Sequence, residues 1–175
     1  MTHRSSLKLL LAVAVVAAFG TPGASATPAI TPACRGGDLI GAFRAVAGSA
    51  GAGSISYKLE LRNVSRGTCF VSGIPRMVLL RANGAALPTH VSPAHPGELT
   101  AVLVRLARGK IAAASARFTP DVPGPGEQVV GRCELAAYKL RVTPNGGRSV
   151  VVPVVPPTPV CVHGRMSFTV LTGAP

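Results

Sequence analysis

The sequence predicts an all-β fold, an antiparallel β-sandwich of the immunoglobulin-like type that forms a single domain with two disulfides. Short segments in which apolar and polar residues alternate are typical of strands with one buried face. The 175 residues include 20 glycines and 16 prolines, and only 4% are aromatic, a turn-rich composition that argues against long helices. Two sheets that cover each other's apolar faces account for both observations.

The clearest predicted strand spans residues 54–62, and residues 138–143 and 165–170 repeat its alternation. Each segment has one apolar face and one polar face, so each predicts a strand with one side in water. The predicted inward residues are Ile55, Tyr57, Leu59 and Leu61 in the first segment, Tyr138, Leu140 and Val142 in the second, and Met166, Phe168 and Val170 in the third.

Three further segments predict strands less clearly. Residues 77–80 precede an Asn83-Gly84 pair that predicts a hairpin returning through residues 85–87. Residues 99–106 have apolar residues at both odd-numbered and even-numbered positions, which favours a strand covered on both faces or a short helical segment. Residues 150–155 contain Pro153, which restricts them to an edge strand. Asn63-Val64-Ser65 matches a glycosylation sequon, but we interpret it as a turn whose Asn side chain bonds nearby backbone.

The N-terminus has the pattern of an export signal. Arg4 and Lys8 form a positive region, residues 7–19 are apolar, and Ala24-Ser25-Ala26 is a small-x-small cleavage site. We therefore predict a signal peptide over residues 1–26, a flexible leader over 27–33 and the β-sandwich domain over 34–173. An uncleaved membrane anchor is the alternative, but the apolar run is shorter than the roughly 20 residues a span needs. The mature form is expected to have no transmembrane segment.

All four cysteines follow the predicted cleavage site. An even number of cysteines in an exported chain predicts disulfides, and four cysteines allow three pairings. We favour Cys34–Cys69 and Cys133–Cys161, because each closes a loop within one half of the chain. A zinc site is the alternative, but the chain lacks the Cys-x-x-Cys spacing typical of such sites.

An ordered series of short motifs resembles a known family. The motifs are Cys34; the small-residue run 47–54 before Leu59-Glu60-Leu61-Arg62-Asn63; Cys69 to Pro75; Val78-Leu79-Leu80 with Asn83-Gly84; Pro96-Gly97 leading to Ala101 and Leu103; Cys133 before Leu140 to Pro144; and Cys161-Val162-His163-Gly164 before Phe168-Thr169-Val170. Over about residues 34–170 the chain resembles the domain of unknown function 4232 family, found in exported proteins and lipoproteins of actinobacteria. The resemblance implies a secreted β-sandwich with two disulfides and no assigned activity.

One group of residues suggests catalysis. His90, Ser92 and His95 lie close in the sequence with Glu98 nearby, as a small secreted hydrolase would require. However, no glycine pair flanks Ser92, and prolines punctuate the segment, so a solvated loop is the better interpretation. We therefore expect no enzymatic activity, and the hydrolase remains the alternative function.

Metal binding has two further candidate pairs. His90 with His95, or His163 with Met166, offers the nitrogen and sulfur ligands that copper prefers. Met166 belongs to the inward face of its predicted strand, whereas His163 lies in a turn before it, so the second pair need not converge. We expect neither a metal nor another cofactor.

Charge is the remaining signal. The chain carries 18 basic and 6 acidic residues, a net charge of +12, and loss of Arg4 and Lys8 with the signal peptide leaves 12 − 2 = +10. Such a charge favours polyanionic partners. A coding bias toward arginine codons also explains part of the net charge. The candidate binding residues are Lys58, Arg62, Lys139 and Arg141 on two outward strand faces, and Arg105 and Arg108.

Nucleic acid is an unsuitable partner, because the protein is predicted to be exported and lacks aromatic residues interleaved with the basic ones. We therefore expect a secreted, monomeric, non-catalytic binding or structural module of the cell envelope. Its expected partner is an anionic cell-wall polymer or an envelope protein.

Overall fold

The computed structural model describes residues 30–97 and 102–174, so the predicted signal peptide and most of the leader lie outside it. Within those residues the fold is all-β, with eleven strands and almost no helix. The elements are η1 (Gly36–Asp38), β1 (Leu39–Ala45), β2 (Ile55–Asn63), β3 (Cys69–Ser72), β4 (Arg76–Leu80), β5 (His90–Pro93), β6 (Leu103–Leu106), β7 (Ile111–Phe118), β8 (Ala137–Thr143), β9 (Val150–Thr158), α1 (Cys161–Gly164), β10 (Arg165–Phe168) and β11 (Thr172–Ala174).

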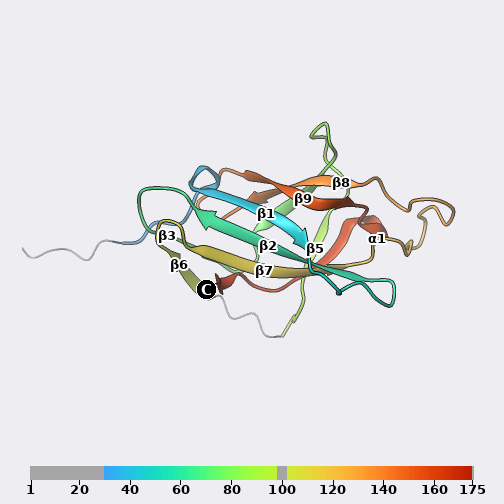
Figure 1. The fold of residues 1–175 in the computed structure, drawn as a ribbon, viewed down its shortest axis with the longest axis horizontal. Coiled ribbons are helices and arrows are strands. Elements are labelled where there is room, and N and C mark those ends of the chain that lie inside the picture. The colour runs from blue at the N-terminus through green and yellow to red at the C-terminus, as the bar shows by residue number, and fades with distance from the viewer. Residues whose placement is uncertain (1–29, 98–101, 175) are drawn as a thin grey trace, which may run out of the picture.

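Most strands form one mixed sheet in the order β4-β8-β9-β1-β2-β7-β10-β5, with β11 also pairing with β7. The sheet curves until it is nearly closed into a barrel, and Thr89, just before β5, accepts a hydrogen bond from Leu79 of β4 at 2.9 Å. β3 and β6 form a separate two-stranded sheet at the opposite end of the molecule from α1 (Figure 1). This arrangement places β1, β2, β7, β10 and β5 side by side.

Two strand pairs depart from the antiparallel arrangement that the sequence predicts. β1 runs parallel to β9, and β5 runs parallel to β10. Parallel neighbours require long crossover connections, and here β5 and β10 are separated in the chain by four other strands. Alternation within single segments reports on strands but not on their neighbours, so the pairing could not be predicted from it.

The core is centred on four aromatic rings. Phe43 of β1 lies 4.9 Å from Tyr57 of β2 and 5.8 Å from Phe168 of β10, measured between ring centroids. Phe118 of β7 lies 5.1 Å from Tyr57. Around them pack aliphatic side chains from both curved halves of the sheet, including Leu59, Leu61, Leu79, Leu140, Val142, Val152, Val154 and Met166. Strands such as β2, β8 and β10 therefore present one face to a shared core and the other to solvent.

The predicted alternation is confirmed in β2, where Tyr57, Leu59 and Leu61 are buried, and in β10, where Met166 and Phe168 are buried. In β8 the predicted inward position of Tyr138 is wrong. A bulge shifts the β8–β9 register between Ala137 and Lys139, so Ala137 is buried and Tyr138 is 46% exposed.

Two other predictions are corrected. Residues 150–155 are not an edge strand, because β9 lies between β8 and β1. Pairing with β1 involves only Val154 and Val155, which follow Pro153, so that proline does not interrupt it. The solvated loop predicted around His90 is instead strand β5, which pairs with β10 at the edge of the sheet.

Residues 103–106 of the predicted strand at 99–106 form β6, and residues 99–101 lie outside the described part of the chain. Two strands without a clear alternation, β1 and β7, were not predicted. β7 is rich in alanine, a residue with low strand propensity, yet Ala112, Ala114 and Ala116 are all buried there.

Two disulfides are present. One joins Cys34 to Cys69 at the start of β3, and the other joins Cys133 to Cys161 in α1. Each is expected to stabilise the fold by about 2–4 kcal/mol. The second disulfide fastens the long β7–β8 connection to the turn that precedes β10.

Candidate functional site

The basic residues predicted to bind lie in three separate places. Lys58 and Arg62 project from β2, whereas Lys139 and Arg141 project from β8, two strands away across β9 and β1. Arg105 lies in β6 of the other sheet, and Arg108 lies in the turn that follows β6. All six side chains belong to exposed residues, but they do not form one cluster.

A more continuous basic surface lies on the outward side of β1, β2, β7, β10 and β5, and we call it the basic face. Each of these five adjacent strands contributes at least one exposed cationic or titratable side chain. The residues are Arg44 of β1, Lys58 and Arg62 of β2, Arg117 of β7, Arg165 of β10 and His90 of β5. Arg44 is directly opposite Lys58, and Arg165 is directly opposite His90.

The basic face contains little negative charge. Glu60 is the one acidic residue in these five strands, and its carboxylate lies 2.9 Å from the Lys58 ammonium. That pair neutralises one positive charge but leaves the arginines free of acidic partners among the described residues. The remaining field is positive, which favours an anionic ligand.

Sequence reasoning found Lys58 and Arg62 but missed Arg44, Arg117 and Arg165. Arg117 lies in the alanine-rich β7, and Arg44 lies in β1, neither of which shows a clear apolar alternation. Arg165 precedes the alternating residues of β10, but its neighbours across the sheet depend on the parallel pairing with β5. No local pattern identifies such neighbours.

At the β1–β2 end of the basic face, a shallow groove of about 410 Å³ runs between two arginines. It is lined by Ile40, Gly41, Ala42, Arg44, Glu60, Arg62 and Ile111. Gly41 allows β1 to approach β2 closely here, because a Cβ atom on it would lie 2.1 Å from the carbonyl oxygen of Glu60. Small residues between the two guanidinium groups leave room for an extended ligand.

At the other end, a cleft of about 330 Å³ contains hydroxyl and guanidinium groups together. It is lined by Ser54, Ser92, Arg117, Phe118, Thr119, Val162, Arg165 and Ser167. The Arg117 guanidinium donates a hydrogen bond to the Ser54 hydroxyl at 2.6 Å. Arginines with neighbouring hydroxyls are well suited to bind phosphate or carboxylate oxygens.

The residues of the alternative hydrolase hypothesis are partly brought together. His90 and Ser92 lie two residues apart in β5 and therefore face the same side of the sheet. However, the Ser92 hydroxyl donates to the carbonyl oxygen of Met166 at 3.4 Å, and the described hydrogen bonds include none between it and a histidine. Glu98 lies outside the described residues. Among the described residues, the Ser92 hydroxyl therefore has no hydrogen-bonded histidine that could act as its base.

A second polar cluster, which the sequence did not predict, surrounds Glu127 in the β7–β8 connection. Its side chain is only 2% exposed and accepts hydrogen bonds from the backbone N–H groups of Gly124, Val162 and His163. Burial by itself raises the pKa of the Glu127 carboxyl, but these hydrogen bonds and the nearby His163 imidazole outweigh it and hold that pKa below its usual range. Glu127 is therefore a buried carboxylate.

The domain as described is an all-β unit fastened by two disulfides, with one strongly basic sheet face. The chain belongs to the family described as a domain of unknown function (DUF4232), whose pattern matches residues 34–172. No curated protein and no solved structure matches the chain. Among residues 30–97 and 102–174, no helix has the length and apolar character needed to cross a membrane.

Proposed function

We propose that this protein is a secreted, non-catalytic module that binds an anionic polymer of the cell envelope through the basic face. The observation that carries the proposal is the presence of arginine or lysine on four adjacent strands, with a histidine on the fifth and a single acidic residue among them. A distribution of lysines and arginines that followed from composition alone would not need to keep them apart from acidic residues, as the basic face does.

The geometry of the face favours a polymer with repeating negative groups. Neighbouring strands lie about 4.8 Å apart, so side chains on adjacent strands present charges at roughly 5–10 Å intervals. The groove beside Arg44 and the cleft beside Arg117 lie at two ends of the same face. A chain of phosphate or carboxylate groups can contact both sites, whereas a single small anion can contact only one.

Secretion is part of this proposal. Two disulfides suit an oxidising compartment, and the export-signal pattern of residues 1–26 agrees with them. We also propose that the protein is a monomer. The two halves of the curved sheet are proposed to pack like the two sheets of an immunoglobulin-like sandwich. An envelope protein with an acidic surface is the alternative partner.

Co-sedimentation with purified actinobacterial cell wall tests the proposal. The oxidised mature protein is mixed with wall at low salt and at several-fold higher salt, and the bound fraction is measured. Binding that persists at high salt supports a shaped site, because screening weakens exposed charge contacts most. Failure to sediment with wall at low salt contradicts the proposal.

A pair of charge-reversal variants locates the site. Arg44→Glu combined with Arg62→Glu changes the basic face, whereas Arg105→Glu combined with Arg108→Glu makes the same change of net charge in β6 and the turn that follows it. The first variant is expected to weaken wall binding by about tenfold or more, equivalent to about 1.4 kcal/mol. The second is expected to retain most of the binding. Equal losses in both variants would mean that net charge, rather than the basic face, drives association.

A further inference from the structure

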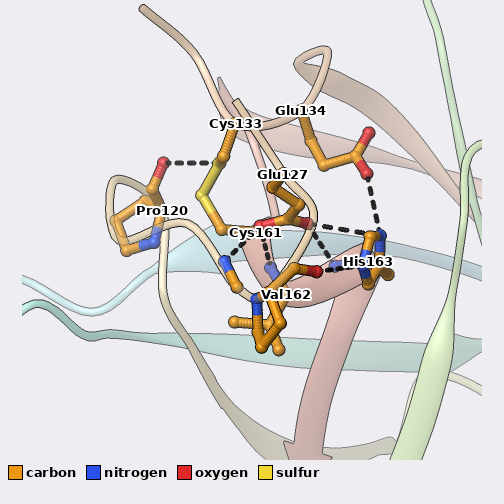
Figure 2. A network of polar contacts seen from close by, with 9 residues as sticks. Pro120, Glu127, Cys133, Glu134, Cys161, Val162 and His163 are labelled. Atoms are coloured by element: carbon orange, nitrogen blue, oxygen red, sulfur yellow. Dashed lines mark hydrogen bonds and ion pairs between the residues drawn. A yellow bond between two sulfur atoms is a disulfide. The ribbon is translucent and has the colours of Figure 1, made fainter. Parts of the chain in front are cut away.

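The cluster around Glu127 brings together three potential metal ligands from two separate parts of the chain. Glu127 and Glu134 lie in the β7–β8 connection, and His163 lies in α1 (Figure 2). The His163 Nδ1 atom is 3.6 Å from Glu127 Oε1 and 3.9 Å from Glu134 Oε1. One ligand atom from each of the three residues lies within 4.8 Å of the others.

The imidazole of His163 is positioned by a hydrogen bond at its Nε2 atom. Its Nε2 atom lies 3.1 Å from the carbonyl oxygen of Pro125. A carbonyl oxygen can only accept a hydrogen bond, so Nε2 carries the proton and donates. The other ring nitrogen, Nδ1, is the one that lies near the two carboxylates. Histidine ligands of metals commonly donate their second ring nitrogen to a backbone carbonyl in this way.

The Glu127 carboxylate is fixed before any ligand arrives. Gly124 and Val162 donate backbone N–H groups to Oε2 at 2.6 and 2.8 Å, and His163 donates its backbone N–H to Oε1. Val162 and His163 reach this carboxylate through left-handed backbone conformations, with φ of 58° and 55°. Oε2 is occupied by two donors, whereas Oε1 retains a lone pair on the side of the imidazole.

Neither carboxylate makes a hydrogen bond to Nδ1, because both distances exceed 3.5 Å. Nδ1 and two carboxylate oxygens thus lie close together without bonding one another, and a cation between the three atoms would be attracted by both carboxylates. The two separations from Nδ1, 3.6 and 3.9 Å, are comparable with those in a zinc site, since Zn–N and Zn–O bonds of about 2.0–2.2 Å place two ligand atoms roughly 3–4 Å apart.

The ligand types select the ion. One imidazole nitrogen with two carboxylate oxygens suits zinc, whereas calcium and magnesium prefer oxygen ligands alone. No thiolate takes part, because Cys133 and Cys161 are joined in the neighbouring disulfide. His163 is 52% exposed and Glu134 20% exposed, so water can complete the coordination from the solvent side.

We propose that Glu127, Glu134 and His163 form a Zn²⁺ site that clamps the β7–β8 connection to the turn before β10. The Cys133–Cys161 disulfide joins the same two segments, so the ion adds a second fastening at one place. The site is independent of polymer binding by the basic face. It differs from the sequence expectation of no metal. It also differs from the candidate His163–Met166 pair, because Met166 is fully buried in the core.

Calorimetric titration of the metal-free, oxidised mature protein with Zn²⁺ tests the site, with thermal unfolding as a second readout. One equivalent is expected to bind, and Tm is expected to rise with Zn²⁺ concentration. In NMR spectra the ring resonances of His163 are expected to shift on addition of Zn²⁺. Absence of Zn²⁺ binding, or equal stabilisation by Ca²⁺ or Mg²⁺, would overturn the proposal.

Matched variants assign the ligands. His163→Asn removes the imidazole while keeping a residue that tolerates the left-handed conformation, and Glu134→Gln removes one charge. Each is expected to weaken Zn²⁺ binding at least about tenfold. The controls are His90→Asn and Glu60→Gln, the same changes in β5 and β2, which are expected to bind Zn²⁺ as the wild type does. Urea unfolding without metal establishes that each variant folds, and undiminished Zn²⁺ binding by folded His163→Asn would overturn the proposal.

Discussion

The Asn63 side chain at the end of β2 donates a hydrogen bond from Nδ2 to the carbonyl oxygen of Leu106 in β6, at 2.7 Å. The second Nδ2 proton goes to the carbonyl oxygen of Gly67 at 2.8 Å, and Oδ1 accepts from both the backbone and the hydroxyl of Ser65. Asn63 is fully buried, so one amide satisfies its own polar atoms while joining the large sheet to the small one. The sequence interpretation of Asn63-Val64-Ser65 as a turn is confirmed.

Replacing Asn63 with alanine is expected to destabilise the fold by about 1–3 kcal/mol, because the Leu106 carbonyl loses its donor in a buried site. Asn63→Asp is expected to be worse, since it places a carboxylate against the Leu106 carbonyl oxygen. Urea unfolding measures both. Asn83→Ala, at an exposed turn asparagine, is the control and should change stability by less than about 1 kcal/mol. Equal losses in the two alanine variants would contradict the role of Asn63.

Gly164→Ala is expected to destabilise the protein by at least about 2 kcal/mol. Gly164 has φ of 74°, and a Cβ atom there would lie 1.8 Å from the Pro88 carbonyl oxygen. Gly84 has φ of 87° but nothing within 4 Å of its Cβ position. Gly84→Ala should therefore show only the backbone strain, about 1 kcal/mol. The difference between the two unfolding free energies isolates the contact, and a difference near zero would mean that the chain around Pro88 moves aside.

Tyr57 makes stability sensitive to alkaline pH. Burial raises the pKa of Tyr57, the Thr158 side chain acts in the opposite direction, and the Tyr57 hydroxyl donates to the Pro156 carbonyl oxygen at 2.9 Å. The unfolded chain therefore ionises Tyr57 first, near pH 10, while the folded protein keeps it neutral. The stabilisation is fully present below the unfolded pKa and is lost as pH rises through the folded pKa.

Tyr57→Phe separates these effects. At neutral pH the variant is expected to lose about 0.5–1.5 kcal/mol with the hydrogen bond. Between about pH 9 and 11 its stability should fall less than that of the wild type, because the titrating group is absent. Tyr138→Phe is the control, since Tyr138 is exposed. Chemical unfolding across this pH range measures the difference, and identical pH dependence in wild type and Tyr57→Phe would be evidence against the role of burial.

Sequence reasoning predicted the all-β class and the buried faces of β2 and β10, because alternation directly reports a strand with one wet side. It failed at Tyr138, where a bulge reverses the side on which a residue lies without leaving a local signal. It missed β7, whose alanines have low strand propensity although the strand pairs with β2 along its whole length. Local patterns therefore describe single strands, and the sheet order needs the structure.

The residues of the candidate sites also divide into those that a local pattern predicts and those that depend on the fold. Lys58 and Arg62 were predicted because they alternate with buried residues on one strand. The basic face depends on which strands are neighbours, and Arg117 reaches it only because β7 lies between β2 and β10. Glu127 and His163 are 36 residues apart and meet through an irregular connection, so no spacing rule could have paired them.

Alanine at His90, Ser92 and His95 distinguishes a binding module from a hydrolase. The Ser92 hydroxyl makes one 3.4 Å hydrogen bond to the Met166 carbonyl oxygen, and His90 and His95 are exposed, so the triple variant should lose little stability. Wall binding should stay within about threefold of wild type, less than 0.7 kcal/mol, because the arginines of the basic face are retained. Release of soluble fragments from purified wall and turnover of model esters should be absent in both proteins. Turnover by the wild type that disappears in the variant would instead identify the β5 residues as catalytic and replace the binding proposal with the hydrolase.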